Sequence, residues 1–411
     1  MHRFIHARYL LLLTGFCLIS FCLISQPLFG QVAGVKHVVL IGIDGLSPDG
    51  VHTANTPQMD EMINGGAYSF KARSVRPTSS SPNWASMIMG AGPEQHGVTS
   101  NGWTANNFTI SPVAKGVESI FPTIYSLLDV QTPDAVTASI YDWDGISRLF
   151  EHSAVDVVIN ASDAEDAVKM AQLTFTQYKP VFTFIHLDHV DHAGHASGWK
   201  SAPYYAAVTE ADGYVKDITD GLASAGMLEE TIIIIASDHG GSGTGHGGDS
   251  MSELETPWLI DGPGIEKDLE ISEPVYIYDT AATIAAVLGV SQPYAWIGRP
   301  VLSVFEEGIL TSNEASIEIP RQPAQFFISQ NYPNPFGPET QFDIELAKSQ
   351  HVDVALYDVQ GKRIASLYEG VLPARQPHPI KVAVADLSNG IYMMRFQGEY
   401  FSTVRSVVLL K

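Results

Sequence analysis

The sequence predicts an α/β fold with a mostly parallel sheet flanked by helices, followed by a small C-terminal antiparallel β-sandwich. Three apolar runs have the pattern of buried strands, at residues 37–43, 181–187 and 231–237. Helical spacing in residues 162–178 and 203–224 separates the strands, and this alternation is typical of a parallel sheet. From Gln341 onward the pattern changes to short alternating strands punctuated by glycines, which favours a sandwich.

The composition of the chain excludes some classes of function. The 411 residues carry a formal net charge of -22, so nucleic acid, which demands a basic face, is not an expected partner. Hydrophobic residues make up 45% and charged residues 17% of the chain, which is enough to bury a sizeable core and excludes wholesale disorder.

The first 30 residues have the pattern of a secretory signal peptide. A basic start precedes an apolar run over residues 9–24, and small residues precede Gln31. The alternative, a membrane anchor, requires about 20 apolar residues, and no later stretch is long enough either, so no integral membrane segment is expected in the mature chain. Because Cys17 and Cys22 both lie in this run, the mature chain is expected to have no disulfide.

Acidic residues follow each of the three apolar strands, at Asp44, Asp191 and Asp238. Ligands of such sheets bind beyond the carboxyl ends of the strands, where these carboxylates are expected to gather. Buried charges at these positions need partners or a metal ion. Each acid also has a simpler interpretation, since a lone aspartate often caps a helix and Asp44-Gly45 is a common turn sequence.

Histidines accompany these acids. His195 lies four residues after Asp191, His239 directly follows Asp238, and His246 lies in a glycine-rich loop that lets a side chain reach inward. Three carboxylates and three imidazoles suit two zinc ions, because zinc accepts mixed nitrogen and oxygen ligands. Taken alone, His239 is equally compatible with a hydrogen-bonded histidine in the core.

A run of serines, Ser79, Ser80 and Ser81, precedes Pro82 and a helical pattern. Such a run is a common helix-capping sequence. A hydroxyl at a helix N-terminus is also a favourable nucleophile beside a metal, because the helix dipole stabilises the anion. Spacing alone does not separate these two interpretations.

Six segments together resemble the alkaline phosphatase superfamily, and within it the type I phosphodiesterase and nucleotide pyrophosphatase family. They lie at residues 42–46, 77–83, 93–97, 191–195, 237–240 and 246–248. The resemblance implies an alkaline phosphatase-like fold with Ser80 as nucleophile, although the family usually has threonine there and Ser79 or Ser81 are alternatives. It also implies that Asn101 binds the phosphate.

The same resemblance implies two metal sites, with zinc the expected ion and other divalent metals possible. Asp191, His195 and His246 would hold one zinc, and Asp44, Ser80, Asp238 and His239 the other. His246 departs from the family pattern, because it follows His239 by only seven residues.

The expected activity is hydrolysis of phosphate esters through a phospho-serine, on a small phosphate ester or nucleotide. A diester is the expected substrate class, because Asn101 is a neutral donor and the sequence has no Asp-Ser-Ala motif of the alkaline phosphatases. The alternatives are a phosphomonoesterase, a phosphonoacetate-type hydrolase and a non-catalytic surface binding protein. Trp84, Trp103 and Phe108 are each candidates for stacking on an aromatic leaving group or for the core.

The last eighty residues or so resemble the C-terminal sorting domain of the type IX secretion system. The resemblance rests on residues 331–336, 356–361, 387–392 and 407–411, and it implies contact with that secretion machinery and a secreted or surface location. A retained carbohydrate-binding sandwich is the alternative. The expected organisation is a signal peptide (1–30), a metallohydrolase domain (31–305), a linker (306–326) and the sorting domain (327–411).

Overall fold

The computed structural model describes residues 32–307, 309, 326–328, 337, 339–346, 348–358, 362–374, 376–383, 387–398 and 402–409. The expected signal peptide, most of the expected linker and the motif at residues 331–336 lie outside the described residues. Within the described part, no helix is both long and apolar enough to cross a membrane.

The larger unit is built on an eight-stranded sheet with the strand order β4-β3-β5-β1-β6-β7-β2-β8. Strands β4, β3, β5, β1 and β6 run parallel, β7 is antiparallel to both β6 and β2, and β8 is parallel to β2. The prediction of a mostly parallel sheet is therefore confirmed. The strands are β1 (His37–Ile43), β2 (Ala67–Arg73), β3 (Thr137–Tyr141), β4 (Val157–Asn160), β5 (Phe182–Leu187), β6 (Thr231–Ala236), β7 (Glu255–Asp261) and β8 (Leu269–Glu270).

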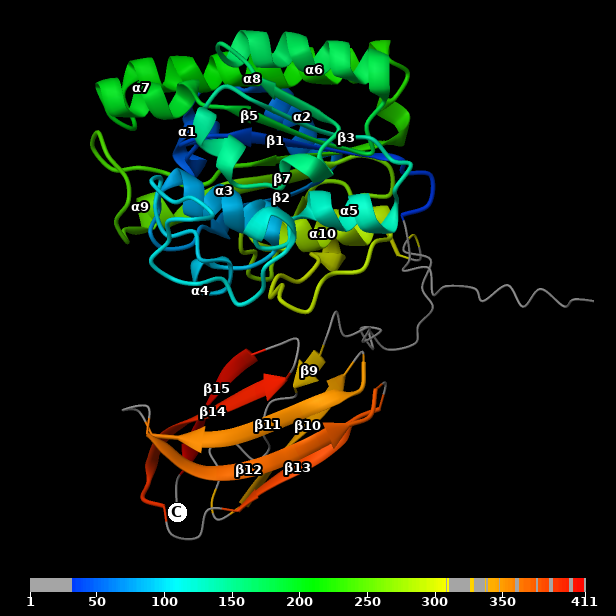
Figure 1. Ribbon diagram of the computed structural model, residues 1–411. Coiled ribbons are helices and arrows are strands. Elements are labelled where there is room, and N and C mark those ends of the chain that lie inside the picture. The colour runs from blue at the N-terminus through cyan, green and yellow to red at the C-terminus, as the bar shows by residue number, and fades with distance from the viewer. Residues whose placement is uncertain are drawn as a thin grey trace, which may run out of the picture.

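Helices cover both faces of this sheet (Figure 1). One face packs against α1 (Pro48–Thr53), α2 (Pro57–Gly65), α6 (Ala164–Tyr178) and α8 (Ala202–Ser224), with α7 (His189–Ser197) beside α8. The other face packs against α3 (Ser80–Met89), α5 (Ile124–Gln131) and α10 (Asp279–Leu288). The short helices α4 (Pro93–His96) and α9 (Met251–Leu254) lie in the connections.

The central strands are apolar on both sides because both faces are covered. In β1, Val38 and Leu40 belong to the core with α3 and α10, whereas Val39 and Ile41 belong to the core with α6 and α8. Side chains alternate along a strand, so one continuous apolar run fills two cores at once.

The C-terminal unit consists of two antiparallel sheets with their own core. One sheet contains β9 (Phe326–Ile328), β10 (Glu339–Leu346) and β13 (His378–Ala383); the other contains β11 (Gln350–Tyr357), β12 (Arg363–Leu372), β14 (Gly390–Gly398) and β15 (Ser402–Leu409). Phe342 and Phe396 meet edge to face across the two sheets, with ring centroids 5.0 Å apart. This arrangement confirms the predicted sandwich.

Two strands of the sandwich were not predicted. Strand β9 has only three residues, and β12 lacks a strict two-residue alternation because its pairing with β11 is interrupted by register shifts. A bulge displaces side chains from the alternating pattern that identifies a strand in a sequence.

Candidate active site

The three predicted acids gather at the carboxyl ends of β1, β5 and β6. Asp44 directly follows β1, Asp238 lies just beyond β6, and Asp191 lies in the first turn of α7, which follows β5. Gly45, with a φ of +69°, makes this approach possible, because a Cβ there would lie 2.9 Å from the Cα of Asp191. All three acids are buried.

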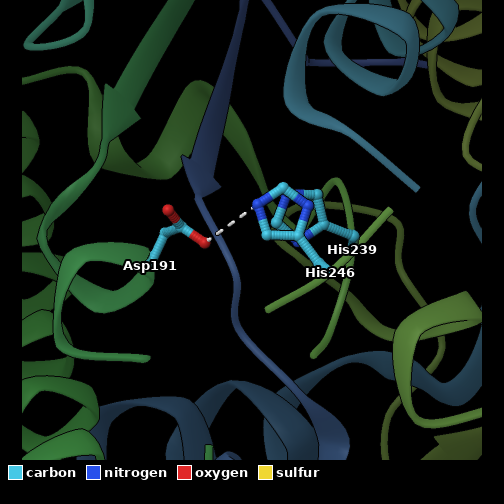
Figure 2. A group of neighbouring side chains, drawn as sticks. All are labelled: Asp191, His239 and His246. Atoms are coloured by element: carbon cyan, nitrogen blue, oxygen red, sulfur yellow. Dashed lines mark ion pairs between the residues drawn. The ribbon is translucent and has the colours of Figure 1, made fainter. Parts of the chain in front are cut away.

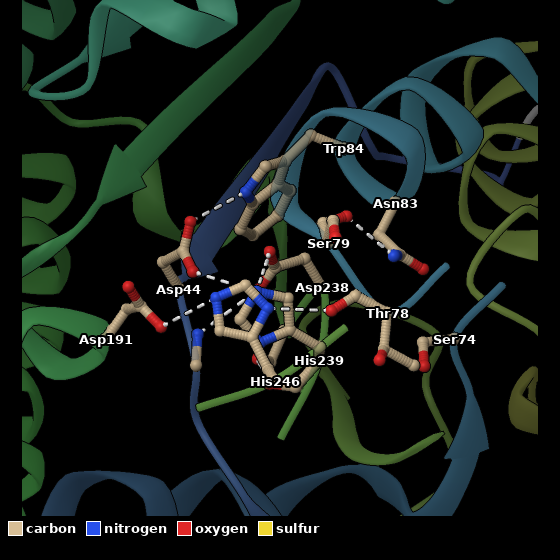
Figure 3. A network of polar contacts seen from close by, with 12 residues as sticks. Asp44, Ser74, Thr78, Ser79, Asn83, Trp84, Asp191, Asp238, His239 and His246 are labelled. Carbon is tan, nitrogen blue, oxygen red and sulfur yellow. Dashed lines mark hydrogen bonds and ion pairs between the residues drawn. The ribbon is translucent and has the colours of Figure 1, made fainter. Parts of the chain in front are cut away.

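Asp44, Asp238 and His239, three of the four residues that the resemblance assigns to one metal, lie together as a candidate metal group (Figure 3). The Nε2 atom of His239 lies 3.0 Å from Asp238 Oδ2 and 3.5 Å from Asp44 Oδ1. The Nδ1 atom of His239 lies 2.9 Å from the carbonyl oxygen of Gly240, to which it donates its proton. Nε2 of the neutral ring is then a bare acceptor facing two carboxylate oxygens, and none of the three buried atoms has a hydrogen-bond partner. A cation bound between them would remove this repulsion.

Asp191, His195 and His246 are also brought together. His195 Nε2 lies 3.3 Å from Asp191 Oδ2 and 3.1 Å from His246 Nε2, and His246 Nε2 lies 3.7 Å from Asp191 Oδ1. Both rings use Nδ1 to donate to a backbone carbonyl, that of Thr244 for His195 and that of Thr78 for His246. Three imidazoles therefore direct a bare Nε2 at carboxylates, which is the tautomer that metal-binding histidines adopt when Nδ1 is held by an outer partner.

The short connection between His239 and His246 does not prevent His246 from reaching the site. A tight turn, in which Ser242 pairs with Gly245, reverses the chain. The ring of His246 then stacks on that of His239, with centroids 3.7 Å apart (Figure 2). Asp191, His239 and His246 form a further candidate metal group, so the two predicted groups adjoin each other.

The pKa values of three of these side chains are shifted because the groups are buried close together. Burial, followed by repulsion from Asp44 and Asp188, raises the pKa of Asp191 to about 9. Burial and the charges of Asp44 and Asp191 likewise raise the pKa of Asp238 well above its usual value. Burial lowers the pKa of His239 to about 4, which keeps the ring neutral. A neutral His239 ring beside carboxylates that resist ionisation without a counter-charge fits divalent metal ions such as zinc.

Asp44 has outer partners that sequence reasoning missed. Its Oδ2 atom accepts a hydrogen bond from Trp84 Nε1 at 3.0 Å and lies 3.2 Å from His186 Nε2. The other nitrogen of His186 lies 3.2 Å from Asp142 Oδ1, so both ring nitrogens face carboxylate oxygens and both carry protons. These contacts leave Asp44 Oδ1 to face His239.

The charge on His186 follows from these contacts. Burial alone would lower its pKa, but the hydrogen bonds and charges of Asp142 and Asp44 raise it to about 10. Burial would raise the pKa of Asp44, but His186 and His239 lower it to about 2. His186 lies in the apolar run of β5, where only its place on the same strand face as Phe184 indicated a buried position.

One further acid, Asp188, and two further histidines, His189 and His192, lie at the start of α7. Asp188 forms a third candidate group with Asp44 and His186, although His186 is itself a cation there. Burial and the charge of Asp44 raise the pKa of Asp188 to about 6. His192 is exposed and lies 3.0 Å from Asp188, whereas His189 contacts the carbonyl oxygen of Ala207.

The serine run leads into α3. Ser79 is the N-cap residue but its side chain makes no capping hydrogen bond, and Ser80 is the first helical residue and is buried. Asn83 holds the preceding loop, because its side chain donates to the carbonyls of Pro77 and Ser79. Thr78 Oγ1 donates to the carbonyl of Gly248 at 2.9 Å. Together with the contact of His246 Nδ1 with the carbonyl of Thr78, this bond ties the loop to that of His246 (Figure 3).

Asn101 lies beside the start of α3, where its Oδ1 atom accepts a hydrogen bond of 2.8 Å from the N–H of Ser81. A buried chain of hydrogen bonds holds the segment before it: the N–H of Val98 donates to His96 Nδ1, and His96 Nε2 donates to Ser86 Oγ. Burial lowers the pKa of His96 to about 3, so the ring is neutral and plays this structural part. Ser80 and Asn101 are thereby held at the same end of α3.

Arg148 was also missed by sequence reasoning. Its Nη2 atom donates to the backbone carbonyl of Asn101 at 2.8 Å, across 47 residues of sequence. It ends the short 3₁₀ helix η2 (Asp144–Arg148), which follows β3.

Of the two alternatives for the aromatic residues, the structure supports the core for Trp84 and Trp103. Trp84 is completely buried and donates to Asp44, and Trp103 is a core residue with 3% of its surface exposed. Phe108 packs partly against the core, with Lys115 Nζ 5.2 Å from its ring centroid.

Comparisons with known proteins agree with this geometry. A sequence model described as type I phosphodiesterase / nucleotide pyrophosphatase matches residues 38–257, more than half of the chain. The chain is 27% identical over 213 residues to ectonucleotide pyrophosphatase/phosphodiesterase family member 1 of Rattus norvegicus, covering 49% of this chain and 24% of that protein. It is 31% identical over 116 residues to arylsulfatase K of Danio rerio, covering 27% of this chain and 22% of that protein. The chain thus spans about a quarter of the length of these curated relatives.

The fold has solved counterparts. Murine ectonucleotide pyrophosphatase/phosphodiesterase 5 superposes with a TM-score of 0.54 at 15% identity, covering 62% of this chain and 96% of that one. A model described as secretion system C-terminal sorting domain matches residues 330–410, which indicates export by type IX secretion and a surface or secreted location. From the match over residues 38–257, which includes every predicted acid and histidine of the site, the chain belongs to the type I phosphodiesterase / nucleotide pyrophosphatase family.

Proposed function

We propose that this protein is a secreted hydrolase with two zinc ions that cleaves phosphodiesters through a phospho-serine on Ser80. The observation that carries the proposal is the convergence of three imidazole Nε2 atoms, from His195, His239 and His246, on three buried carboxylates. One oxygen of each carboxylate, Asp44 Oδ1, Asp191 Oδ1 and Asp238 Oδ2, has no hydrogen-bond partner. Without a metal, these facing carboxylates and imidazoles destabilise the folded protein, and bound divalent cations would remove that cost.

The two metal groups keep the division that the family resemblance implies. Asp191, His195 and His246 would hold one ion, and Asp44, Asp238 and His239 the other, with Ser80 added to the second set. When bound, the ions would supply positive charge that favours the serine alkoxide and the anionic phosphoryl group.

The protein's own residues account for positioning. Ser80 begins the ten-residue helix α3, whose N-terminal dipole stabilises negative charge on the serine oxygen. Because Asn101 Oδ1 accepts from Ser81, its amide nitrogen is left to donate to a phosphoryl oxygen. Attack of Ser80 Oγ on phosphorus expels the ester oxygen of the leaving group, and water then cleaves the Ser80–phosphorus bond to release the product and restore the hydroxyl.

The proposal extends to the ends of the chain. We place a signal peptide at residues 1–30 and a sorting domain from residue 327, joined to the hydrolase by a linker at residues 306–326. The sorting-domain match over residues 330–410 supports the second boundary, and β9 begins beside it at Phe326.

Substitution of the three serines tests the nucleophile. Ser80→Ala is expected to abolish hydrolysis of bis(p-nitrophenyl) phosphate while metal content and melting temperature stay near those of the parent. Ser79→Ala and Ser81→Ala are matched controls from the same turn and are expected to keep most of the activity. Near-parental turnover by Ser80→Ala, together with inactivity of either control, would overturn the assignment.

A further inference from the structure

We propose that Trp199 is a positioning residue that sets the affinity of both metal sites, because its indole holds the backbone of one group and the imidazoles of the other. This inference rests on the proposed function of the site and deepens it by naming a residue outside both ligand sets on which both ions depend. The Asp44 group comprises Asp44, Asp238 and His239, and the Asp191 group comprises Asp191, His195 and His246.

The indole nitrogen of Trp199 is tied to the loop that follows β1. Trp199 lies just beyond α7 with 6% of its surface exposed, and its Nε1 atom donates to the carbonyl oxygen of Gly45 at 2.9 Å. Gly45 follows Asp44 in the chain, and its N–H donates to Asp238 Oδ1 at 3.2 Å. The bond from Trp199 therefore fixes a residue that adjoins one carboxylate of the Asp44 group and donates to another.

The ring of Trp199 lies against the Asp191 group. Its centroid is 5.5 Å from that of His195 at an interplanar angle of 84°, and 6.1 Å from that of His246 at an angle of 71°. Both imidazoles thus meet the indole edge to face. Packing of this kind limits rotation of the imidazoles, which would otherwise turn their Nε2 atoms away from Asp191.

The segments that carry the ligands fit closely around this indole. A Cβ atom at Gly194 would lie 2.8 Å from the indole, and one at Gly241 would lie 2.2 Å from it, so no side chain fits at either position. The N–H of Trp199 also donates to the carbonyl of Gly243 at 2.8 Å, in the glycine-rich turn after β6. One residue therefore contacts the loop after β1, helix α7 and the loop after β6, which together carry all six ligands of the two groups.

Two other aromatic residues provide comparisons. Trp296 is 7% exposed, and its indole donates to the carbonyl of Pro122 at 2.8 Å, a residue of neither metal group. Tyr204 reaches the same carbonyl as Trp199, that of Gly45, with its Oη atom 3.0 Å away. Trp296 thus matches Trp199 in burial and bonding, whereas Tyr204 matches it at one contact.

Competition with a chromogenic zinc chelator measures the affinity of each group separately. His195→Ala retains the Asp44 group and His239→Ala retains the Asp191 group, so each variant serves as a background with one ion. Trp199→Phe keeps an aromatic ring but removes the indole N–H and part of the packed surface. It is expected to weaken zinc binding about 10- to 100-fold in both backgrounds, as loss of a residue that orients metal ligands does.

Matched variants separate positioning from general packing. Trp296→Phe makes the same exchange away from both groups and is expected to change zinc affinity less than about threefold in either background. Tyr204→Phe is expected to weaken zinc binding about tenfold in the His195→Ala background only, because its hydroxyl supports the loop after β1. Melting temperatures recorded with a chelator present show whether each variant is folded.

Unchanged zinc affinity of Trp199→Phe in either background would overturn the inference, and equal losses for Trp199→Phe and Trp296→Phe would reduce the role of Trp199 to packing. If Trp199→Phe does not fold, Tyr204→Phe decides: unchanged zinc affinity in the His195→Ala background would disprove the link between the Gly45 carbonyl and the ion. Because the titration requires no turnover, a parent that binds two ions but hydrolyses no diester would reject the proposed hydrolase and leave the role of Trp199 standing. A parent that binds no zinc would overturn both.

Discussion

Removing the buried imidazolium of His186 should destabilise the α/β unit strongly. Its two nitrogens each lie 3.2 Å from a carboxylate oxygen, of Asp44 and of Asp142, and the ring is fully buried. In His186→Gln one neutral amide group replaces two charged donors, so both buried carboxylates lose their cationic partner. Breaking a buried ion pair in this way costs about 3–5 kcal/mol in the free energy of unfolding.

Urea unfolding followed by tryptophan fluorescence measures this cost, because all six tryptophans lie in the larger unit, at positions 84, 103, 143, 199, 258 and 296. A chelator should be present in every sample, so that metal loss does not contribute to the difference. His192→Gln is the matched control: His192 also pairs with an aspartate, Asp188 at 3.0 Å, but its side chain is 73% exposed. That change is expected to cost less than about 1 kcal/mol. Equal costs for the two variants would refute the argument that His186 is a buried cation holding Asp44.

Three further predictions concern the site and the tail. Asn101→Ala should lower kcat for a diester about 10²- to 10³-fold, as loss of one oxyanion donor does, and a loss below tenfold in steady-state kinetics would contradict its role. Burial and nearby carboxylates raise the pKa of Asp191 to about 9, and the carboxylate partners of His186 raise its pKa to about 10 against the effect of burial. Both groups then hold more protons folded than unfolded between pH 7 and 9, so the melting temperature of the metal-free protein should fall across that window, and zinc should reduce the fall. Mass spectrometry of protein secreted by its native host should show loss of roughly residues 1–30 and of the region after about Ala324, and intact Lys411 would mean that the sandwich is retained.

The fold was predictable from the sequence for those elements whose burial produces a simple pattern of apolar residues. Strands β1, β5 and β6 are uninterrupted apolar runs because they are covered on both faces, and α8 shows a clear helical period. Strand β12 escaped prediction because bulges interrupt its alternation.

The positions of the candidate metal ligands were predictable for a related reason. The end of a buried strand fixes the position of a charged residue that follows it, so Asp44 and Asp238 could be placed at the edge of the sheet from sequence alone. His186 could not, since one histidine inside an apolar run has the pattern of a core residue and its partner Asp142 lies 44 positions away. The contact between Arg148 and Asn101 could not be predicted either, because the two residues are 47 positions apart and no local sequence pattern links them.

We propose that two groups of side chains at the carboxyl edge of the sheet each hold one metal ion. Elemental analysis of the purified protein and of the variants His195→Ala and His239→Ala measures how many ions are bound. We expect close to two zinc or other divalent ions per chain in the parent, and loss of about one ion in each variant, since the two histidines belong to different groups. A parent with one ion or none per chain would rule out a two-ion site.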